Sequence, residues 1–335
     1  MTGFEYVTYR GSKEGKVVEA KALIETLGPD EVILKVTHSG LCGTDLHYTS
    51  QDMVLGHEGV GVVQQVGSQV TKFKVGDRAG WGYLHDACLE CEQCLKGDEI
   101  FCDKRHLYGT HEFDQGAFAS HAVWKAAFLF HIPDSLSSTD AAPLMCAGAT
   151  VFTALQKLGV RSTDRVGVIG IGGLGHLAIQ FASKMGCEVV VFSGTESKRE
   201  EAVELGADEF YATRGVEKLQ IGSKLDYLIV TTSQQPDWSL YLPLMVPQGS
   251  IVPLSVSREN FNMPYMPLVL HGLRVQGSLT ASRGIHEQML RFAAHHKIKP
   301  IVQEYPLTLD GLVEAMDKLD QGQMKYRGVL VSQHP

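Results

Sequence analysis

The amino-acid sequence predicts an α/β protein with two domains, a compact barrel-like β domain and a doubly wound parallel sheet. Two observations carry this prediction. The chain up to about residue 140 is rich in glycine and contains short, closely spaced strand patterns, such as residues 31–36 and 59–66, which are typical of a barrel. After Pro143, short apolar runs alternate with helical repeats, which is typical of parallel strands joined by crossover helices.

The alternation of strands and helices in the second half can be followed along the chain. A buried strand is expected at residues 165–169, and a helix follows because apolar side chains recur at helical spacing from Leu174 to Met185. A strand at 188–192 and a helix over 198–205 come next. Further strands are expected at residues 225–230, 250–254 and 273–277.

Length and composition limit the class of protein. A chain of 335 residues, 44% of them hydrophobic, can bury a large core in about two domains. The formal net charge is -8 and no segment concentrates Lys and Arg, so neither nucleic acid nor an anionic membrane is expected as a partner. Residues 1–10 lack the apolar core of a signal peptide, and no run is long enough to cross a bilayer. We therefore expect a cytoplasmic protein.

Four of the seven cysteines form a C-x2-C-x2-C-x7-C cluster. They are Cys88, Cys91, Cys94 and Cys102. Four soft thiolates with no open position predict a structural tetrahedral zinc site. Two alternatives are a four-cysteine iron–sulfur cluster and disulfides. The bacterial ferredoxin run ends in Cys-Pro, whereas Asp103 follows here, and disulfides are rare in a reducing compartment.

A G-x-G-x-x-G motif, residues 170–175, follows the predicted strand and begins the predicted helix. In that context it predicts a dinucleotide site, because helix N-terminal N–H groups face a bound pyrophosphate. Gly170 would permit the tight turn, Gly172 the approach of backbone to the pyrophosphate, and Gly175 close helix–sheet packing. Gly173 and Leu174 complete the loop. The alternative is a tight turn that binds no ligand.

The end of the second strand of this domain predicts which nicotinamide cofactor binds. An NAD site usually has Asp or Glu there, for the ribose hydroxyls, but this chain has Ser193. Ser193 and Thr195, followed by Lys198 and Arg199, suit a 2'-phosphate, so NADP(H) is expected rather than NAD(H). The alternative is a solvated helix start, although cations are not favoured at a helix N-terminus. Glu196 counts against the phosphate interpretation.

Three further motifs stand in one order along the chain. They are Cys42-Gly-Thr-Asp-Leu-His47, Gly56-His-Glu58 and Pro143-Leu-Met-Cys146-Ala-Gly-Ala-Thr150. Together with the four-cysteine cluster and the Gly-rich loop, they make the whole chain resemble the zinc-dependent medium-chain alcohol dehydrogenases. Residues 193–202 resemble most closely the cinnamyl-alcohol-dehydrogenase-like, NADP-using branch.

The resemblance implies a domain organisation and an assembly. Residues 1–146 would form a GroES-like β-barrel catalytic domain, with a structural-zinc lobe at 86–104. Residues 147–281 would form the Rossmann cofactor domain, and 282–335 would return to complete the catalytic domain. The assembly would be a homodimer or homotetramer. Taken by themselves, the apolar residues 265–270 are expected to pack within the domain, and the alternative is that they line an intersubunit surface.

The resemblance also implies a second, catalytic zinc. Cys42, His57 and Cys146 would hold it with one position open for substrate, an arrangement known for zinc enzymes. Glu58 would approach or briefly ligate the metal, and Asp45 would accept a hydrogen bond from the His57 ring.

The implied proton relay and cofactor contacts involve four more residues. Thr44 would take the proton of the alcohol, and His47 would pass it to solvent through the cofactor ribose. Thr150 and Arg327 would contact the cofactor, Arg327 at the pyrophosphate.

The reaction implied is hydride transfer between NADP(H) and a zinc-bound alcohol or carbonyl group of a small molecule. Cys42 and His57 are 15 positions apart, fewer than in related enzymes, which predicts an open pocket for a bulky or aromatic substrate. A rival account is that residues 108–113 or a partner subunit close the gap. Two other functions stay open: reduction of an iminium or activated C=C bond, and nucleotide binding without turnover.

Overall fold

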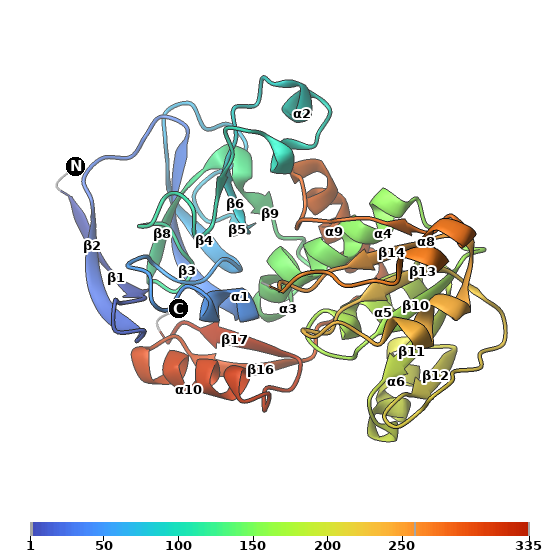
Figure 1. Cartoon of the computed structure of the whole chain (residues 1–335). Helices are drawn as coiled ribbons and strands as arrows, with labels where there is room; N and C mark the ends of the chain where they lie inside the picture. Colours follow the sequence, from blue (N-terminus) through green and yellow to red (C-terminus); the bar gives the residue numbers. More distant parts are fainter. Residues whose placement is uncertain (1–2, 258, 334–335) are drawn as a thin grey trace. The chain divides into compact units, whose positions relative to one another are not determined.

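The protein is described by a computed structural model that covers residues 3–257 and 259–333. The chain divides into two compact units (Figure 1). The first unit combines Met1–Ala149 with Thr280–Pro335, and the second is Thr150–Leu279. The sequence-based boundaries are residues 146 and 281, against 149 and 279 here.

The first unit is built on a seven-stranded, largely antiparallel sheet. Along its main path the order is β16-β17-β3-β4-β5-β9, and β8 pairs with β3. The parallel pair is β16 with β17. The strands are β3 (Glu31–Leu41), β4 (Gly59–Val66), β5 (Arg78–Trp81), β8 (His121–Lys125), β9 (Phe130–His131), β16 (Val302–Pro306) and β17 (Arg327–Val331).

The C-terminal segment completes this sheet. Strand β17 runs antiparallel to β3, with Gly328 opposite Leu41. Residues almost 290 positions apart in the chain therefore become neighbours. This register brings Arg327 to the end of β3, where the first motif residue, Cys42, follows.

Smaller elements surround the sheet of the first unit. Two hairpins lie outside it, β1 (Phe4–Arg10) with β2 (Val18–Ile24), and β6 (Leu84–Asp86) with β7 (His106–Leu107). The helices are α1 (Gly43–Leu46), α2 (Glu92–Leu95), α3 (Ser138–Pro143), α9 (Arg283–His296) and α10 (Leu309–Asp320). Short 3-10 turns are Glu99–Phe101 and Ala126–Phe128, and a π-helical turn spans Leu144–Gly148.

The second unit contains a six-stranded sheet with the order β12-β11-β10-β13-β14-β15. All its pairs are parallel. Numbered within the unit, this order is 3-2-1-4-5-6, the doubly wound order in which nucleotides bind where the strand order reverses. The strands are β10 (Arg165–Ile169), β11 (Glu188–Ser193), β12 (Glu209–Ala212), β13 (Leu225–Val230), β14 (Met245–Pro253) and β15 (Arg274–Val275).

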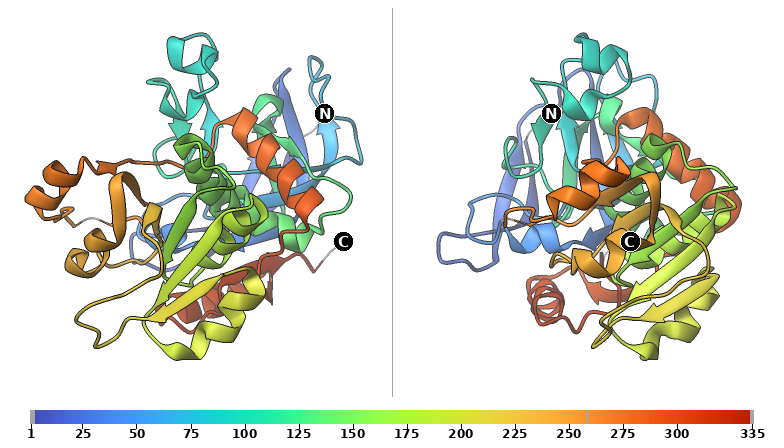
Figure 2. Two further views of the ribbon diagram at one scale, coloured as in Figure 1. Left: turned by 90° about the vertical axis from the view of Figure 1, so that its right-hand side faces the viewer. Right: turned by 45° about the vertical axis from the view of Figure 1, so that its right-hand side comes forward.

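The helices of the second unit pack against this sheet. α5 contacts β10 and β11, and α6 packs beside β12 at one edge (Figures 1 and 2). The helices are α5 (Gly175–Lys184), α6 (Arg199–Leu205), α7 (Trp238–Tyr241) and α8 (Tyr265–His271), with 3-10 turns at Glu196–Lys198 and Leu242–Leu244. α4 (Ala149–Leu158) begins at the junction.

The structure confirms the predicted fold class, a barrel-like β unit and a parallel doubly wound unit. Several elements differ in extent from the prediction, among them β14, which begins at Met245 instead of residue 250, and β3, which continues to Leu41 instead of residue 36. The helix expected from residue 198 begins at Arg199, because the 3-10 turn Glu196–Lys198 precedes it. The strand expected at 273–277 is only Arg274–Val275, since it pairs on one side alone at the edge of the sheet. Within residues 3–257 and 259–333, no helix is long and apolar enough to cross a membrane.

Candidate active site and metal centres

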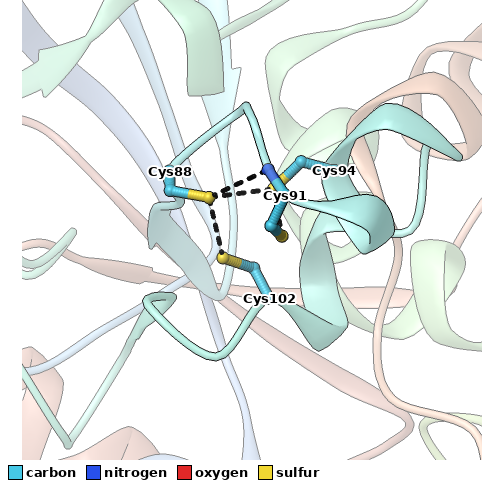
Figure 3. Close-up of side chains that lie close together, drawn as sticks. All are labelled: Cys88, Cys91, Cys94 and Cys102. Atoms are coloured by element: carbon cyan, nitrogen blue, oxygen red, sulfur yellow. Dashed lines mark hydrogen bonds between the residues drawn. The ribbon is translucent and has the colours of Figure 1, made fainter.

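The four-cysteine cluster is a loop wrapped around one point. Cys91 precedes α2, Cys94 lies within α2, and Cys102 ends the 3-10 turn Glu99–Phe101. Positive φ angles at Leu89 and Gly97, 59° and 77°, bend the chain between the cysteines. Figure 3 shows the four side chains pointing toward one another.

The sulfur spacing of this cluster fits a single tetrahedral metal ion. The Cys88 sulfur lies 3.8 Å from Cys94 and 3.5 Å from Cys102, and Cys91 lies 3.6 Å from Cys94. Four zinc–sulfur bonds of about 2.3 Å in a tetrahedron put the sulfurs about 3.8 Å apart. The cysteines are free, and these sulfur separations exceed the length of a disulfide bond, about 2.05 Å. A cluster of several irons needs its thiolates farther apart than these are.

Backbone hydrogen bonds prepare one of these thiols for a metal. Hydrogen bonds from the backbone at Glu90 and Cys91 lower the pKa of Cys88 to about 6. The thiolate, rather than the thiol, is the form that ligates metal. The donor set and the spacing therefore both fit zinc.

A second set of metal-ligating groups lies elsewhere in the first unit. One donor atom each from Cys42, His57, Glu58 and Cys146 lies within 4.8 Å of all the others. Cys42 follows β3, and His57 with Glu58 precedes β4. Because β3 and β4 are antiparallel neighbours, with Ser39 opposite Gly59, the end of one strand meets the start of the next.

Cys146 enters this set from the π-helical turn Leu144–Gly148. Such turns are rare and concentrate at functional sites. Its thiol is buried, and the hydrogen bond that it donates to Cys42, together with burial, raises the pKa of Cys146. The same hydrogen bond with Cys146 leads the effects that lower the pKa of Cys42.

Asp45 holds the His57 ring in one orientation. Asp45 Oδ1 lies 2.9 Å from His57 Nδ1, and its Oδ2 accepts a bond of 2.9 Å from the Cys42 backbone N–H. Burial lowers the pKa of His57, but the Asp45 charge and hydrogen bond more than offset it and raise the pKa well above its ordinary value. Within the described residues, His57 Nε2 is buried without a partner. It is therefore the nitrogen available to a metal.

The two carboxylate oxygens of Glu58 have different surroundings. Its Oε1 is paired with the buried guanidinium of Arg327, while its Oε2 has no partner among the described residues. Burial raises the pKa of Glu58 to about 7 against the opposing charge of Arg327. A Cβ added at Gly40 would lie 1.9 Å from Glu58 Oε2, so only glycine leaves room for this carboxylate. The sequence-based role of Arg327 at a pyrophosphate stays a prediction.

The expected proton relay lies on α1. Thr44 Oγ1 lies 3.6 Å from Cys42 Sγ, and His47 ends the helix with its side chain exposed. Residues three apart share one face of a helix, so both can face the same side. The transfer between them stays a prediction.

Three tyrosines beside the ligand set were not expected from the sequence. Tyr108 is fully buried, donates to Asp45 Oδ1 at 2.9 Å and accepts from the Gly56 N–H at 2.9 Å. The Tyr83 ring lies 5.4 Å from the His57 ring, edge to face, and Tyr48 lies 5.2 Å from Tyr108. Burial, followed by the neighbouring Tyr48 phenol, raises the pKa of Tyr83. Tyr108 belongs to the segment that the sequence indicated could close the gap, but no sequence pattern gave any of the three tyrosines a role at the site.

The short connection 48–55 is packed rather than open within the first unit. The Val54 N–H donates to the Phe113 carbonyl at 2.8 Å, and the Leu55 N–H donates to the Tyr9 carbonyl at 3.0 Å. Met53, Val54 and Leu55 are fully buried. The segment 108–113 therefore occupies space beside the shortened loop, as the rival account required.

The Gly-rich loop has the geometry that the motif predicts. Gly170 has a φ of 92°, in the left-handed region that favours glycine. A Cβ at Gly175 would lie 2.0 Å from the Gly170 carbonyl oxygen, whereas a Cβ at Gly172 would meet nothing within 4 Å. Gly175 is thus required by packing, while Gly172 keeps the backbone open to a ligand.

The predicted phosphate-binding residues take up different positions. Ser193 ends β11 and is buried, and Thr195 Oγ1 lies 2.9 Å from Ser197 Oγ. Lys198 reaches back to the Gly-rich loop and donates to the Ile171 carbonyl at 2.7 Å. Arg199 instead pairs with Glu196 and lies over the Phe210 ring at 4.9 Å. Thr150 is buried in α4.

Family models and curated relatives both identify this chain as an alcohol dehydrogenase. The model of the alcohol dehydrogenase GroES-like domain matches residues 28–134, and that of the zinc-binding dehydrogenase matches 173–295. A probable formaldehyde dehydrogenase of Bacillus subtilis is 35% identical over 318 residues, covering 91% of this chain and 90% of the relative. An NADP-dependent alcohol dehydrogenase of Mycolicibacterium smegmatis is 34% identical over 319 residues, covering 91% of each.

Solved structures agree with these relatives. A cinnamyl alcohol dehydrogenase of Sorghum bicolor superposes with a TM-score of 0.90 at 31% identity, covering 98% of each chain. A Helicobacter pylori enzyme of the same name, complexed with NADP(H), gives a TM-score of 0.89 at 26% identity, covering 98% of this chain and 99% of that one. The β unit with its ligand sets and the doubly wound unit with its Gly-rich loop define a two-part oxidoreductase. The chain belongs to the zinc-dependent medium-chain alcohol dehydrogenases, in the cinnamyl-alcohol-dehydrogenase-like branch.

Proposed function

We propose that this alcohol dehydrogenase uses NADP(H) to interconvert a bulky or aromatic alcohol and its aldehyde or ketone. The observation that carries the cofactor choice is Ser193 at the end of β11, where an acidic side chain would repel a 2'-phosphate. Lys198, held at the Gly-rich loop, adds positive charge there. A relative is named for NADP dependence, and a structural neighbour contains NADP(H).

The residues of the first unit fit a catalytic and a structural zinc. Cys42, His57 and Cys146 would hold the first, which would act as a Lewis acid on the substrate oxygen. Asp45 fixes the His57 ring so that Nε2 faces the ligand set. The buried Arg327 limits the negative charge that Glu58 adds beside two thiolates. Cys88, Cys91, Cys94 and Cys102 would hold the second ion and stabilise the lobe.

The chain's own residues would move the proton. In oxidation, the carbon-bound hydrogen leaves as hydride to the nicotinamide ring, and the hydroxyl proton must go elsewhere. Thr44 Oγ1, beside Cys42, would accept it, and the exposed His47 would deliver it to solvent. Reduction of a carbonyl reverses each transfer. Because both relay residues are present, carbonyl chemistry is favoured over reduction of an iminium or C=C bond.

The tyrosines support an aromatic substrate. Tyr48 and Tyr83 are only partly buried, and Tyr83 lies against the ring of the ligand His57. Aromatic rings stack edge to face or offset, which adds about 0.5–1.5 kcal/mol per pair beyond burial of area. Relatives named as cinnamyl alcohol dehydrogenases are consistent with such a substrate.

We also propose a cytoplasmic homodimer. Exposed apolar side chains gather on α8, where Tyr265 is 74% and Leu270 is 71% accessible to solvent. The neighbouring strand β15 is the edge of its sheet. Exposed apolar patches of this kind mark protein interfaces. Measuring the mass in solution by light scattering tests the dimer, and a monomer at micromolar concentration would rule it out.

The proposed function is tested by steady-state kinetics on the zinc-loaded protein. We expect kcat/KM for NADPH to exceed that for NADH, and cinnamaldehyde and benzaldehyde to be better substrates than acetaldehyde. An iminium substrate should react poorly. Equal use of both cofactors would overturn the NADP(H) assignment, and a steady fall of kcat/KM with carbonyl size would overturn the substrate assignment.

A further inference from the structure

A cation that the motif analysis did not use lies beside the end of β11. Arg214 follows β12, which is parallel to β11 with Ser193 opposite Ala212. The loops that leave two neighbouring parallel strands emerge at the same edge of a sheet. Backbone hydrogen bonds then hold the loops together, from Thr213 N–H to the Ser193 carbonyl at 2.8 Å and from Arg214 N–H to the Gly194 carbonyl at 3.2 Å.

The Arg214 guanidinium lies in front of Gly194. Its Nη2 atom lies 4.0 Å from the point that a Cβ at Gly194 would occupy. The side chain is exposed and, in the part of the chain that the structure describes, makes no hydrogen bond or ion pair. A glycine at position 194 therefore leaves space in front of an uncompensated positive charge.

The two cations expected from the sequence are engaged differently. Arg199 is paired with Glu196 and lies over the Phe210 ring, so its positive charge is already compensated by a carboxylate. Lys198 donates to the Ile171 carbonyl and supplies a point charge at the Gly-rich loop. A planar guanidinium can bind two phosphate oxygens at once, which an ammonium cannot.

We infer that Arg214 is the residue that selects NADP(H), by binding the ribose 2'-phosphate across Gly194, with the hydroxyls of Ser193 and Thr195. This inference rests on the proposed use of NADP(H). It assigns the guanidinium contact to the loop after β12, rather than to Arg199 at the start of α6.

Equilibrium binding tests the assignment without turnover. Calorimetry on the zinc-loaded protein measures Kd for NADPH, NADH and adenosine 2',5'-bisphosphate. Loss of a charge-assisted contact is expected to raise the Kd of Arg214→Ala for NADPH and the bisphosphate by ~10- to 100-fold. The NADH value should stay within about twofold, since NADH has no 2'-phosphate to lose a contact. Arg214→Lys should recover part of the affinity.

Arg199→Ala tests the rival arginine that the sequence motif suggested, an exposed residue at the start of α6 whose charge is already paired with Glu196. It should change the NADPH Kd by less than about threefold. If the wild type binds NADPH more tightly than NADH but Arg214→Ala leaves both unchanged, the inference is wrong and the proposed cofactor stands. If the wild type binds NADH at least as tightly and does not bind the bisphosphate, the proposed cofactor itself is wrong.

Discussion

The two metal-ligating sets of the first unit are built in opposite ways. The four cysteines of the lobe come from one stretch of 15 residues, residues 88–102, with one hairpin and two short helical turns around them. The second set takes Cys42, His57 and Cys146 from three places that together span 104 positions of the chain. The lobe can form around its ion locally, whereas the second set exists only once the sheet has formed.

The two sets also differ in what supports their ligands. The lobe cysteines contact one another and backbone N–H groups. Three members of the second set have a further partner, since Asp45 binds His57 and the Cys42 backbone, and Arg327 binds Glu58. Four cysteines that leave no open coordination position suit a structural ion. Ligands held by further side chains, with a buried His57 Nε2 that has no partner among the described residues, suit a catalytic ion.

The largest expected effect is on stability, from Cys94→Ser. Structural zinc contributes its binding energy to folding, so loss of one of four thiolates should lower the free energy of unfolding by several kcal/mol. Thermal unfolding followed by circular dichroism, with zinc analysis, measures this. A variant that melts like the wild type with one zinc fewer would contradict a structural role.

Cys146→Ser should do the reverse and remove turnover while the fold survives. Loss of a Lewis acid worth several kcal/mol should lower kcat about 10³-fold or more. Cys187→Ser is the control, because this buried cysteine belongs to neither set and should leave kcat unchanged. Full activity of Cys146→Ser would remove it from the catalytic set.

Asp45→Asn tests whether the carboxylate that holds the His57 ring contributes to metal affinity. A carboxylate that holds a metal-bound histidine typically contributes 10- to 100-fold in metal affinity or activity. The Asp45→Asn variant should therefore lose zinc at a 10- to 100-fold lower chelator concentration than the wild type. Tyr108→Phe removes one hydrogen bond to the same carboxylate and should cost about 1 kcal/mol. Equal effects of the two substitutions would argue against a special role for the carboxylate charge.

Gly40→Ala should disturb Glu58 by contact alone. The added methyl group would overlap Glu58 Oε2, and relief of such overpacking costs about 1–3 kcal/mol. Both unfolding temperature and kcat should fall. Gly43→Ala, where nothing lies within 4 Å of the new methyl group, is the control and should be neutral. Equal unfolding temperatures and equal kcat values for the two variants would mean that the Glu58 side chain can move away from the added methyl group.

His286 is a buried histidine that belongs to neither metal-ligating set, so its effect on stability can be compared with theirs. Burial, with the Lys72 charge, lowers the pKa of His286 to about 3. The unfolded chain, with an ordinary pKa near 6.5, binds the proton first, so stability falls as the pH falls from about 6.5 toward 3. At pH 5 the loss is about 2 kcal/mol. His286→Gln should flatten the dependence of unfolding temperature on pH between 7 and 5, and an unchanged slope would contradict the assignment.

Much of the fold could be predicted because its signals are local. Apolar periodicity identified the strands and helices of the second unit, and their alternation predicted parallel pairing, which the order β12-β11-β10-β13-β14-β15 confirms. The Gly-rich loop could be predicted equally well, because the strand, the turn and the helix that contain residues 170–175 follow one another in the chain. Element boundaries were predicted less accurately. The start of α6, for example, was expected at Lys198 but lies at Arg199, because the same residue types occur in a 3-10 turn and in the α-helix that follows it.

The sequence by itself determined the elements, the four-cysteine lobe and the residue types that carry the chemistry. The tertiary structure alone decided which distant side chains meet: Arg327 with Glu58, 269 positions apart, and Tyr108 with Asp45, 63 positions apart. Spacing constrains residues within one turn or element, whereas contacts between elements depend on strand register and on packing. Register places Arg327 at the end of β3 and Arg214 beside Gly194, and no pattern of neighbouring residues encodes either position.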